Sequence, residues 1–226
     1  MAEPENLSRL QASLPDGVKL VAVSKFHPVA TIREVYGAGQ RLFGENRVQE
    51  LIAKQPELPD DIEWHFIGTL QTNKVKYIAP FVSMIQSVDT LKLMQEVNRQ
   101  AGKCNRNIRV LLEVHIAEED SKHGFSPEEC KALFADGRQA QFENIRICGL
   151  MGMATFTDDT EQVRREFRAL RTLFDHIKSL PATDKSVFTE LSMGMSDDFR
   201  IAIEEGGTMV RIGSAIFGER LLRPSQ

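Results

Sequence analysis

The sequence predicts an α/β fold in which eight parallel strands close into a single (β/α)8 TIM barrel. Short apolar runs recur eight times along the chain, and segments with helical periodicity lie between them. No linker rich in proline, glycine or serine divides the 226 residues. We therefore expect one barrel domain over residues 1–226, preceded by an extra amphipathic helix around Glu3 to Ser13.

The eight apolar runs give the expected strands in order. They are Val18 to Lys25, Arg41 to Asn46, Ile62 to Gly68, Ser83 to Asp89, Ile108 to Ile116, Ile145 to Met153, Val187 to Gly194 and Thr208 to Gly218. A doubly wound open sheet is the structural alternative. The count of eight and the lack of a G-x-G-x-x-G turn after the first strand favour the barrel.

Helical periodicity predicts the segments between the strands. The expected helices cover 29–39, 47–55, 91–103, 126–137 and 160–178, and a further helix opens at 71–74. The longest repeats apolar residues in a stripe suited to packing against a barrel wall, namely Val163, Phe167, Leu170, Phe174 and Ile177. Ser126, Pro127 and Glu129 have the spacing of a capped helix start.

Composition and charge exclude several classes of protein. The chain carries 32 acidic and 28 basic residues and no basic run, so nucleic acid is not an expected partner. The three cysteines, Cys104, Cys130 and Cys148, lie far apart, which favours a reducing cytoplasm over a zinc site or a disulfide framework. The chain shows neither a signal peptide nor about 18 consecutive apolar residues, so we expect a cytoplasmic location and no membrane partner.

Lys25 is the first candidate for chemistry, because the carboxyl ends of barrel strands hold the active site. Period-two alternation places Val21, Val23 and Lys25 on one face of the first strand. A lysine pointing inward at the mouth loses hydration, which lowers its pKa and leaves amine free to attack an aldehyde. The alternative is a strand-end lysine whose ammonium reaches solvent.

Arg211, Gly213 and Ser214 form the second group of candidates, at the end of the last strand. Arg211 and Gly213 share a face, and an inward arginine could hold a carboxylate or phosphate, or approach a ring nitrogen. Its alternative role is a buried salt bridge with Glu113 or Glu45. Gly213 and Ser214 offer backbone N–H groups and a hydroxyl where barrels commonly bind phosphate.

Further polar residues close the neighbouring strands. Ser192 and Ser196 could complete the phosphate site, although Ser196 or Asp197 could instead cap the following helix. Asn46 and His65 are candidates to line the site, and the alternative for His65 is a hydrogen-bonded core histidine. The sequence contains no HxH or HxxE metal spacing, no G-x-S-x-G and no P-loop, so we expect no metal.

Several motifs together resemble one family. VAVSK, FGENRVQE, WHFIGTLQTNK, SKHGF, GLMGMA, LSMGMSDD and TMVRIGSAIFGER occur in this order between about Val18 and Arg220. They resemble the pyridoxal 5′-phosphate (PLP) homeostasis proteins, single-domain barrels of the PLP fold type III related to the N-terminal half of alanine racemase. Two stretches depart from the commonest pattern, Phe26-His27 and Glu113-x-His115, and these could alter the polarity or access of the pocket.

The resemblance implies PLP as the cofactor and assigns roles to individual residues. Lys25 would carry the cofactor as an internal aldimine. Ser192, Gly213 and Ser214 would lie near the phosphate, and Arg211 would lie beside the pyridine nitrogen. An arginine there keeps the ring nitrogen unprotonated, which weakens PLP as an electron sink and discourages carbanion chemistry.

The expected function is therefore to hold PLP and hand it over to PLP-dependent apoenzymes, with no demanding turnover. A racemase also needs a second acid or base, yet Tyr36 and Tyr77 lie in helical segments and the chain ends soon after Gly218. Without a second domain we expect a monomer. One alternative is an amino-acid racemase or other PLP enzyme that borrows a base from a partner or from His65. Another is a barrel enzyme without PLP in which Lys25 forms an imine with a sugar phosphate.

Overall fold

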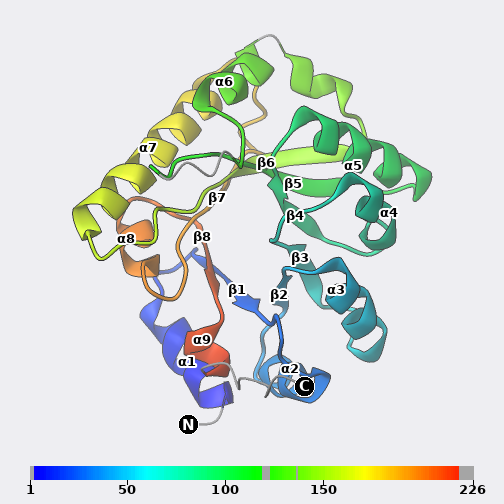
Figure 1. Cartoon of the computed structure of the whole chain (residues 1–226), viewed down its shortest axis with the longest axis vertical. Coiled ribbons are helices and arrows are strands. Elements are labelled where there is room, and N and C mark those ends of the chain that lie inside the picture. Colours follow the sequence, from blue (N-terminus) through cyan, green and yellow to red (C-terminus); the bar gives the residue numbers. More distant parts are fainter. Residues whose placement is uncertain (1–2, 119–122, 136, 219–226) are drawn as a thin grey trace.

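Eight parallel strands form a closed sheet at the centre of the molecule, and helices surround it (Figure 1). The computed structural model describes residues 3–118, 123–135 and 137–218. Each strand pairs with the next along the chain, and the last pairs with the first through the register Val21 to Arg211. This closure confirms the predicted barrel and excludes the open sheet.

Each strand is shorter than its apolar run and lies inside it. The strands are β1 Lys19–Val23, β2 Leu42–Glu45, β3 Glu63–Phe66, β4 Met84–Val88, β5 Ile108–Glu113, β6 Ile145–Met151, β7 Glu190–Ser192 and β8 Met209–Ile212. The expected strand to Gly218 is wrong beyond Ile212, because Gly213 turns the chain into a short helix, α9 Ser214–Phe217. Ile216 and Phe217 are buried as part of this helix, so their apolar character does not indicate a continuation of the sheet.

Helices cover the outside of the sheet at the predicted places. They are α1 Glu3–Ser13, α2 Val29–Gly37, α3 Val48–Lys54, α4 Val75–Ile78, α5 Leu91–Lys103, α6 Pro127–Ala135, α7 Thr160–Ser179 and α8 Phe199–Glu204, with 3-10 turns η1 Gln55–Glu57, η2 Thr72–Lys74 and η3 Arg138–Gln141. All members of the predicted stripe on α7 are buried. The predicted cap of α6 is a reciprocal pair in which the Ser126 and Glu129 side chains each accept from the other's backbone N–H.

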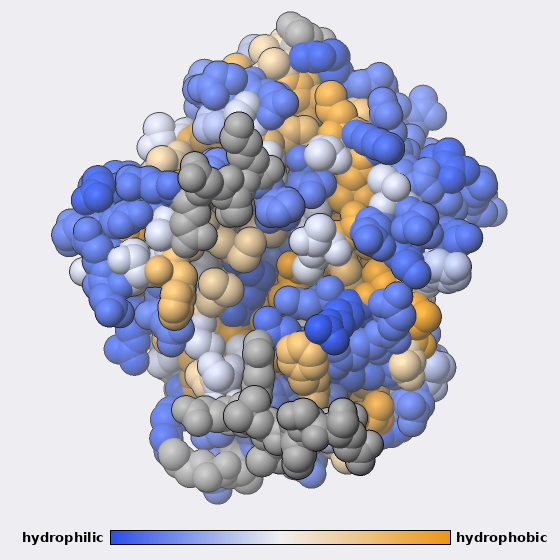
Figure 2. All heavy atoms as spheres, in the orientation of Figure 1, coloured by the Kyte–Doolittle hydropathy of each residue, from blue (hydrophilic) through white to orange (hydrophobic). Residues whose placement is uncertain are grey.

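Two apolar cores result from the alternation along the strands. Val21, Met84, Leu111, Cys148, Met151 and Met209 fill the barrel interior. Leu20 and Ala22 point outward into the larger core between the sheet and the helices. Burying one large apolar side chain contributes about 1.5–3 kcal/mol, so both phases of the alternation stabilise the fold. Figure 2 shows hydrophilic side chains over α5, α7 and α8 at the outer rim of the molecule.

The strands β6 and β7 approach closely at Gly149. This glycine has φ +154°, and a Cβ built on it would lie 1.7 Å from the carbonyl oxygen of Glu190. On its other side the pairing of β5 with β6 shifts register between Val110 and Leu111. The Met-rich GLMGM motif thus has two roles. Its Gly149 allows the close approach of the two backbones, and its Met151 packs in the barrel interior.

The described part of the chain contains no helix that combines the length and apolar character needed to cross a membrane.

Candidate functional site

A cavity of about 320 Å³ opens at the carboxyl ends of the strands. The sequence-predicted residues Lys25, Asn46, Arg211, Gly213 and Ser214 all line it. Its volume falls within the range of about 300–1,000 Å³ typical of small-molecule sites. Residues that are far apart in the sequence therefore meet at one place in the fold.

Lys25 lies at the rim of this cavity, two residues after the end of β1. Val21 fills the interior and Val23 lines the cavity, so the alternation carries Lys25 to the mouth as predicted. The next residue, Phe26, adopts a left-handed conformation with φ +68°, which turns the chain away. Its N–H donates to the Glu50 carboxylate at 2.5 Å, and this bond holds the turn in place.

A buried ionic network lies directly behind Lys25. The Lys54 ammonium donates to Glu45 Oε1 at 2.8 Å, to Glu50 Oε1 at 2.6 Å and to the backbone oxygen of Ser24 at 2.8 Å. The Ser24 hydroxyl donates to Glu45 Oε1 at 2.6 Å. Burial raises the pKa of Glu45, and the charge of Lys54 opposes that rise. Because the network fixes the Ser24 backbone, it also fixes the attachment point of the Lys25 side chain.

Arg211 is the buried cation of the cavity floor, with 4% of its surface exposed. Its Nη1 donates to Ser192 Oγ at 2.7 Å, and its Nη2 donates to the backbone oxygen of Gly152 at 3.2 Å. Burial lowers the pKa of Arg211 to about 10, against the opposing charges of Asp198 and Glu113. The guanidinium therefore stays fully charged at neutral pH.

The predicted alternative for Arg211, a salt bridge with Glu45 or Glu113, is not formed within the described residues. Glu45 pairs with Lys54 on the outside of β2. Glu113 is buried, with a pKa raised by burial and by the charge of Asp89, and its charge acts on Arg211 from beyond ion-pair distance. A buried cation without a paired carboxylate is costly, which indicates that the cavity admits an electron-rich ligand group.

Hydroxyl groups and a glycine occupy the wall near β8. Ser214 Oγ donates to Ser196 Oγ at 2.9 Å, and both serines line the cavity. A Cβ on Gly213 would lie 3.0 Å from the backbone oxygen of Val23, so only glycine fits comfortably between β8 and β1. Neither Ser196 nor Asp197 caps α8: the preceding residue is Asp198, whose carboxylate accepts from Met195 N at 2.5 Å.

Asn46 lies immediately after β2 and lines the cavity. Its Oδ1 is buried and has no hydrogen-bond partner among the described residues. Buried polar atoms are nearly always satisfied, so this oxygen is positioned to accept from a ligand. Gly68 makes room for this segment, because a Cβ on it would lie 2.4 Å from the backbone oxygen of Asn46.

Ser192 and His65 lie below the cavity instead of lining it. Ser192 is fully buried, and its hydroxyl donates to Gln86 Oε1 at 2.6 Å. Gln86 Nε2 lies 2.9 Å from His65 Nδ1, and burial lowers the pKa of His65 to about 3. The alternative interpretation, a hydrogen-bonded core histidine, therefore describes His65, and its contact with a cavity occurs at the opposite mouth.

The two departures from the family pattern fall at different places. His27 lines the cavity and stacks on Phe217 with ring centroids 4.6 Å apart, so it forms part of the wall. Glu113 and His115 do not line it. Of the SKHGF motif, Ser121 and Lys122 lie outside the described residues.

Sequence reasoning missed Gln86 and the apolar rim. Gln86 could have been found, because it shares the inward face of its strand with Met84. Met153, Phe156 and Met195 also line the cavity, and Phe156 is 90% exposed. No periodicity marks loop residues of this kind. Among the described residues, no cluster of histidine, cysteine or acidic side chains could hold a metal ion.

Comparison with known proteins identifies close relatives. The family described as alanine racemase, N-terminal domain, matches residues 3–221. The pyridoxal phosphate homeostasis protein of Aquifex aeolicus is 45% identical over 203 residues, which cover 89% of this chain and 87% of that protein. The human protein of the same name is 40% identical over 216 residues, 89% of this chain and 76% of its own.

Solved structures agree with these sequence relatives. PipY of Synechococcus elongatus, solved with PLP bound, is 39% identical and superposes with a TM-score of 0.87, covering 96% of this chain and 100% of PipY. Alanine racemase from Streptomyces coelicolor is 20% identical with a TM-score of 0.74, and the match covers 97% of this chain but 58% of the racemase. The second likeness concerns the fold alone.

Proposed function

From the premise that this chain belongs to the pyridoxal phosphate homeostasis protein family, we propose that it binds PLP at the carboxyl-end mouth of its barrel and helps to maintain the cytoplasmic supply of this cofactor. The observation that carries the proposal is the convergence on one cavity of the Lys25 amine, the Arg211 guanidinium and the Ser196–Ser214 hydroxyl pair.

The residues of the cavity fit the functional groups of PLP. Lys25 Nζ would hold the aldehyde carbon, and the Ser196 and Ser214 hydroxyls with the backbone at Gly213 would hold the phosphate. Arg211 would donate to the ring nitrogen from the cavity floor, and Asn46 Oδ1 offers an acceptor at the wall. Bound PLP supplies an electron sink for reactions at amino acids.

The groups around the cavity favour retention over turnover. Because Arg211 keeps its proton at neutral pH, it would form a hydrogen bond to the ring nitrogen of PLP and leave that nitrogen unprotonated. Tyr36 donates to Asp61 on the outside of the barrel, at 2.6 Å, and Tyr77 is exposed on α4. His65 is neutral and lies beneath the floor. The protein would thus hold PLP and release it to apoenzymes, acting as a monomer.

Chemical trapping tests the binding site. The protein is loaded with PLP, reduced with borohydride and digested, and the peptides are mapped by mass. We expect a pyridoxyl adduct on Lys25, a yellow protein before reduction, and neither in Lys25→Ala. Lys74→Ala, which changes a half-buried lysine on η2, serves as the matched control and should behave like the parent. An adduct at another lysine would contradict the site, and imine trapping only with a sugar phosphate would favour an enzyme without PLP.

A second measurement separates a carrier from a racemase. The loaded protein is mixed with an apoenzyme whose activity requires PLP, and in parallel with single enantiomers of common amino acids. We expect recovery of apoenzyme activity and no conversion between enantiomers. Appreciable racemisation that disappears in Lys25→Ala would contradict the carrier.

A further inference from the structure

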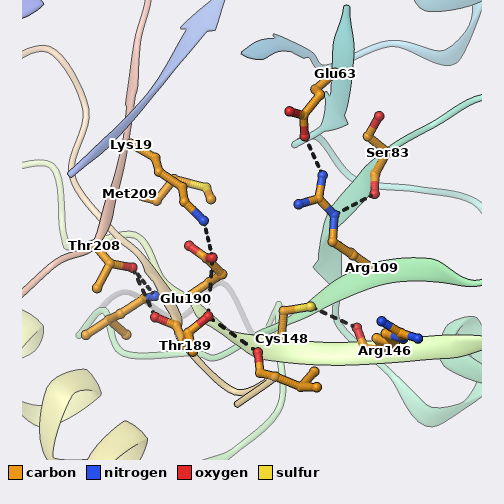
Figure 3. A network of polar contacts seen from close by, with 12 residues as sticks. Lys19, Glu63, Ser83, Arg109, Arg146, Cys148, Thr189, Glu190, Thr208 and Met209 are labelled. Atoms are coloured by element: carbon orange, nitrogen blue, oxygen red, sulfur yellow. Dashed lines mark hydrogen bonds and ion pairs between the residues drawn. The ribbon is translucent and has the colours of Figure 1, made fainter. Parts of the chain in front are cut away.

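Glu166 is a buried carboxylate on α7 that does not line the PLP cavity. Acidic side chains at the opposite mouth of the barrel are neutralised by cations: Figure 3 shows Lys19 directed toward Glu190 and Arg109 toward Glu63. Across the residues that the structure describes, Glu166 meets no cation, although it is only 5% exposed. It accepts hydrogen bonds from N–H and O–H groups instead.

These donors come mainly from two loops that follow neighbouring strands. Thr155, after β6, donates its N–H to Glu166 Oε2 and its hydroxyl to Oε1, each at 2.7 Å. Glu118, after β5, shares its N–H between Glu166 Oε1 at 3.3 Å and Thr155 Oγ1 at 3.1 Å. Gln162, one turn earlier on α7, adds a bond to Oε1 at 3.1 Å. Glu166 therefore joins the loop after β6 to the loop after β5.

The loop after β6 connects this carboxylate to the PLP cavity. We call residues 152–156 the rim segment. At its first residue, the backbone oxygen of Gly152 accepts from Arg211 Nη2 on the cavity floor at 3.2 Å. Its side chains Met153 and Phe156 line the cavity. One end of the rim segment is thus bonded to the cavity floor, and the carboxylate on α7 holds it near the other end.

Packing contributes little to the position of the rim side chains. Phe156 is 90% exposed and Met153 is 43% exposed, so neither is held over the cavity by burial of its apolar surface. Hydrogen bonds to a carboxylate are stronger than those between neutral groups, and burial of Glu166 strengthens them further. The bonds from Thr155 to Glu166 therefore fix the rim segment where apolar packing does not.

We propose that Glu166 is a positioning residue for the cofactor site: it holds the rim segment at the cavity mouth and thereby slows the escape of PLP. This inference rests on the proposed function and deepens it. Because Glu166 does not line the cavity, its loss should leave the bond between PLP and Lys25 unchanged and act on the rate of release.

Hydrogen exchange of the PLP-free protein tests the contact itself. Each oxygen of Glu166 accepts from at least one donor, so the amide nitrogen of Glu166→Gln leaves a donor unpaired at either place. Thr155→Val removes the hydroxyl, whereas Thr155→Ser keeps it. We expect faster exchange over residues 152–156 in Glu166→Gln and Thr155→Val, the parent rate in Thr155→Ser, and unchanged strands in all three. Equal exchange in the parent and Glu166→Gln would overturn the contact.

Release of PLP is measured with the loaded proteins. Each is mixed with an excess of a PLP-requiring apoenzyme, and the absorbance of bound PLP is followed with time. We expect release to be about tenfold faster or more in Glu166→Gln and Thr155→Val, as for loss of a hydrogen bond to a charged group, and close to the parent rate in Thr155→Ser. Borohydride should still trap PLP on Lys25 in every variant.

Leu173→Ala separates positioning from a general loss of stability. Leu173 is buried on α7 about two turns beyond Glu166, so its truncation should weaken the fold and leave the release rate unchanged. A parent that binds no PLP would overturn the proposed function, and this inference with it. A parent that binds PLP and a Glu166→Gln protein that releases it at the same rate would overturn the inference alone, as would equal acceleration in Leu173→Ala.

Discussion

Two buried cations near the same mouth of the barrel, Lys54 and Arg211, are satisfied in opposite ways. The Lys54 side chain is 8% exposed and meets the carboxylates of Glu45 and Glu50. Arg211 is similarly buried but donates to Ser192 and Gly152, and it has no ion pair with a described carboxylate. The first charge is neutralised by the protein and serves the fold, whereas the second lacks a paired carboxylate, as the proposed PLP site requires.

The largest expected effect breaks the neutralised pair. Lys54→Met leaves the buried Glu45 carboxylate without its cation, and removal of one partner from a buried pair costs about 3–5 kcal/mol of unfolding free energy. Urea unfolding near neutral pH measures the loss. Arg168→Met is the matched control, because Arg168 is exposed in its pair with Glu205 and solvent screens such a pair, so its loss should cost far less. Equal losses in the two variants would contradict the distinction.

The second largest effect concerns His65, which hydrogen bonds through Gln86 and Ser192 connect to Arg211. Folding lowers the pKa of His65 from 6.5 to about 3, so the unfolded chain takes up a proton below pH 6.5 that the folded protein does not. The contribution of neutral His65 to the free energy of unfolding is therefore fully present above pH 6.5 and is lost as the pH falls toward 3. At about pH 5 the loss is roughly 2 kcal/mol, since each pH unit corresponds to about 1.36 kcal/mol.

Urea unfolding near neutral pH and near pH 5 checks this prediction, and His65→Gln should lack the dependence. The measured quantity is the difference between the parent and this variant. Burial raises the pKa of Glu45, Glu113 and Asp198, and these carboxyls change stability in the opposite direction: their contribution is present at low pH and is lost as the pH rises through their folded pKa. A parent and variant with parallel pH profiles would contradict a neutral His65.

Arg211→Gln should separate stability from binding. The substitution removes a buried unpaired charge, which offsets the loss of the hydrogen bonds to Ser192 and Gly152, so we expect unfolding free energy to change by about 1 kcal/mol or less. PLP affinity, measured by equilibrium dialysis, should fall about tenfold or more. A stability loss as large as that of Lys54→Met, with unchanged affinity, would assign Arg211 to the fold.

The smallest expected effect on stability is that of Lys25→Ala. Lys25 is half-buried at the rim, and substitutions of this kind usually change unfolding free energy by about 0.5 kcal/mol. The variant should therefore unfold at nearly the parent's urea concentration while losing covalent PLP. A marked destabilisation would show that the lysine also supports the barrel.

The sequence was sufficient to predict the face on which each candidate lies, because alternation is a property of the strand itself. Lys25, Arg211 and Gly213 reach the cavity for this reason. Alternation does not give the height of an inward residue between the two mouths. His65 and Ser192 point inward as the pattern requires, but the barrel register places them below the floor.

The limits of individual elements depend on tertiary geometry in a similar way. The apolar run after Met209 continues to Gly218, yet pairing with β1 ends at Ile212 and the rest is helical. An apolar residue such as Ile216 indicates a buried position, but its type does not distinguish burial within a strand from burial within a helix. Gln86 was predictable from the pattern, whereas the loop residue Phe156 carries no periodic signal.

The one-way series from Arg211 to His65 determines how protons can move through the barrel. Every bond in it has its donor on the Arg211 side, so a proton could pass toward His65 only if the guanidinium released one. The pKa of about 10 for Arg211 prevents that release at neutral pH, and the Gln86 amide in the middle of the series transfers protons poorly. This series of hydrogen bonds therefore does not carry protons between the two mouths of the barrel, and acid–base chemistry at either mouth must exchange protons with the solvent at that mouth.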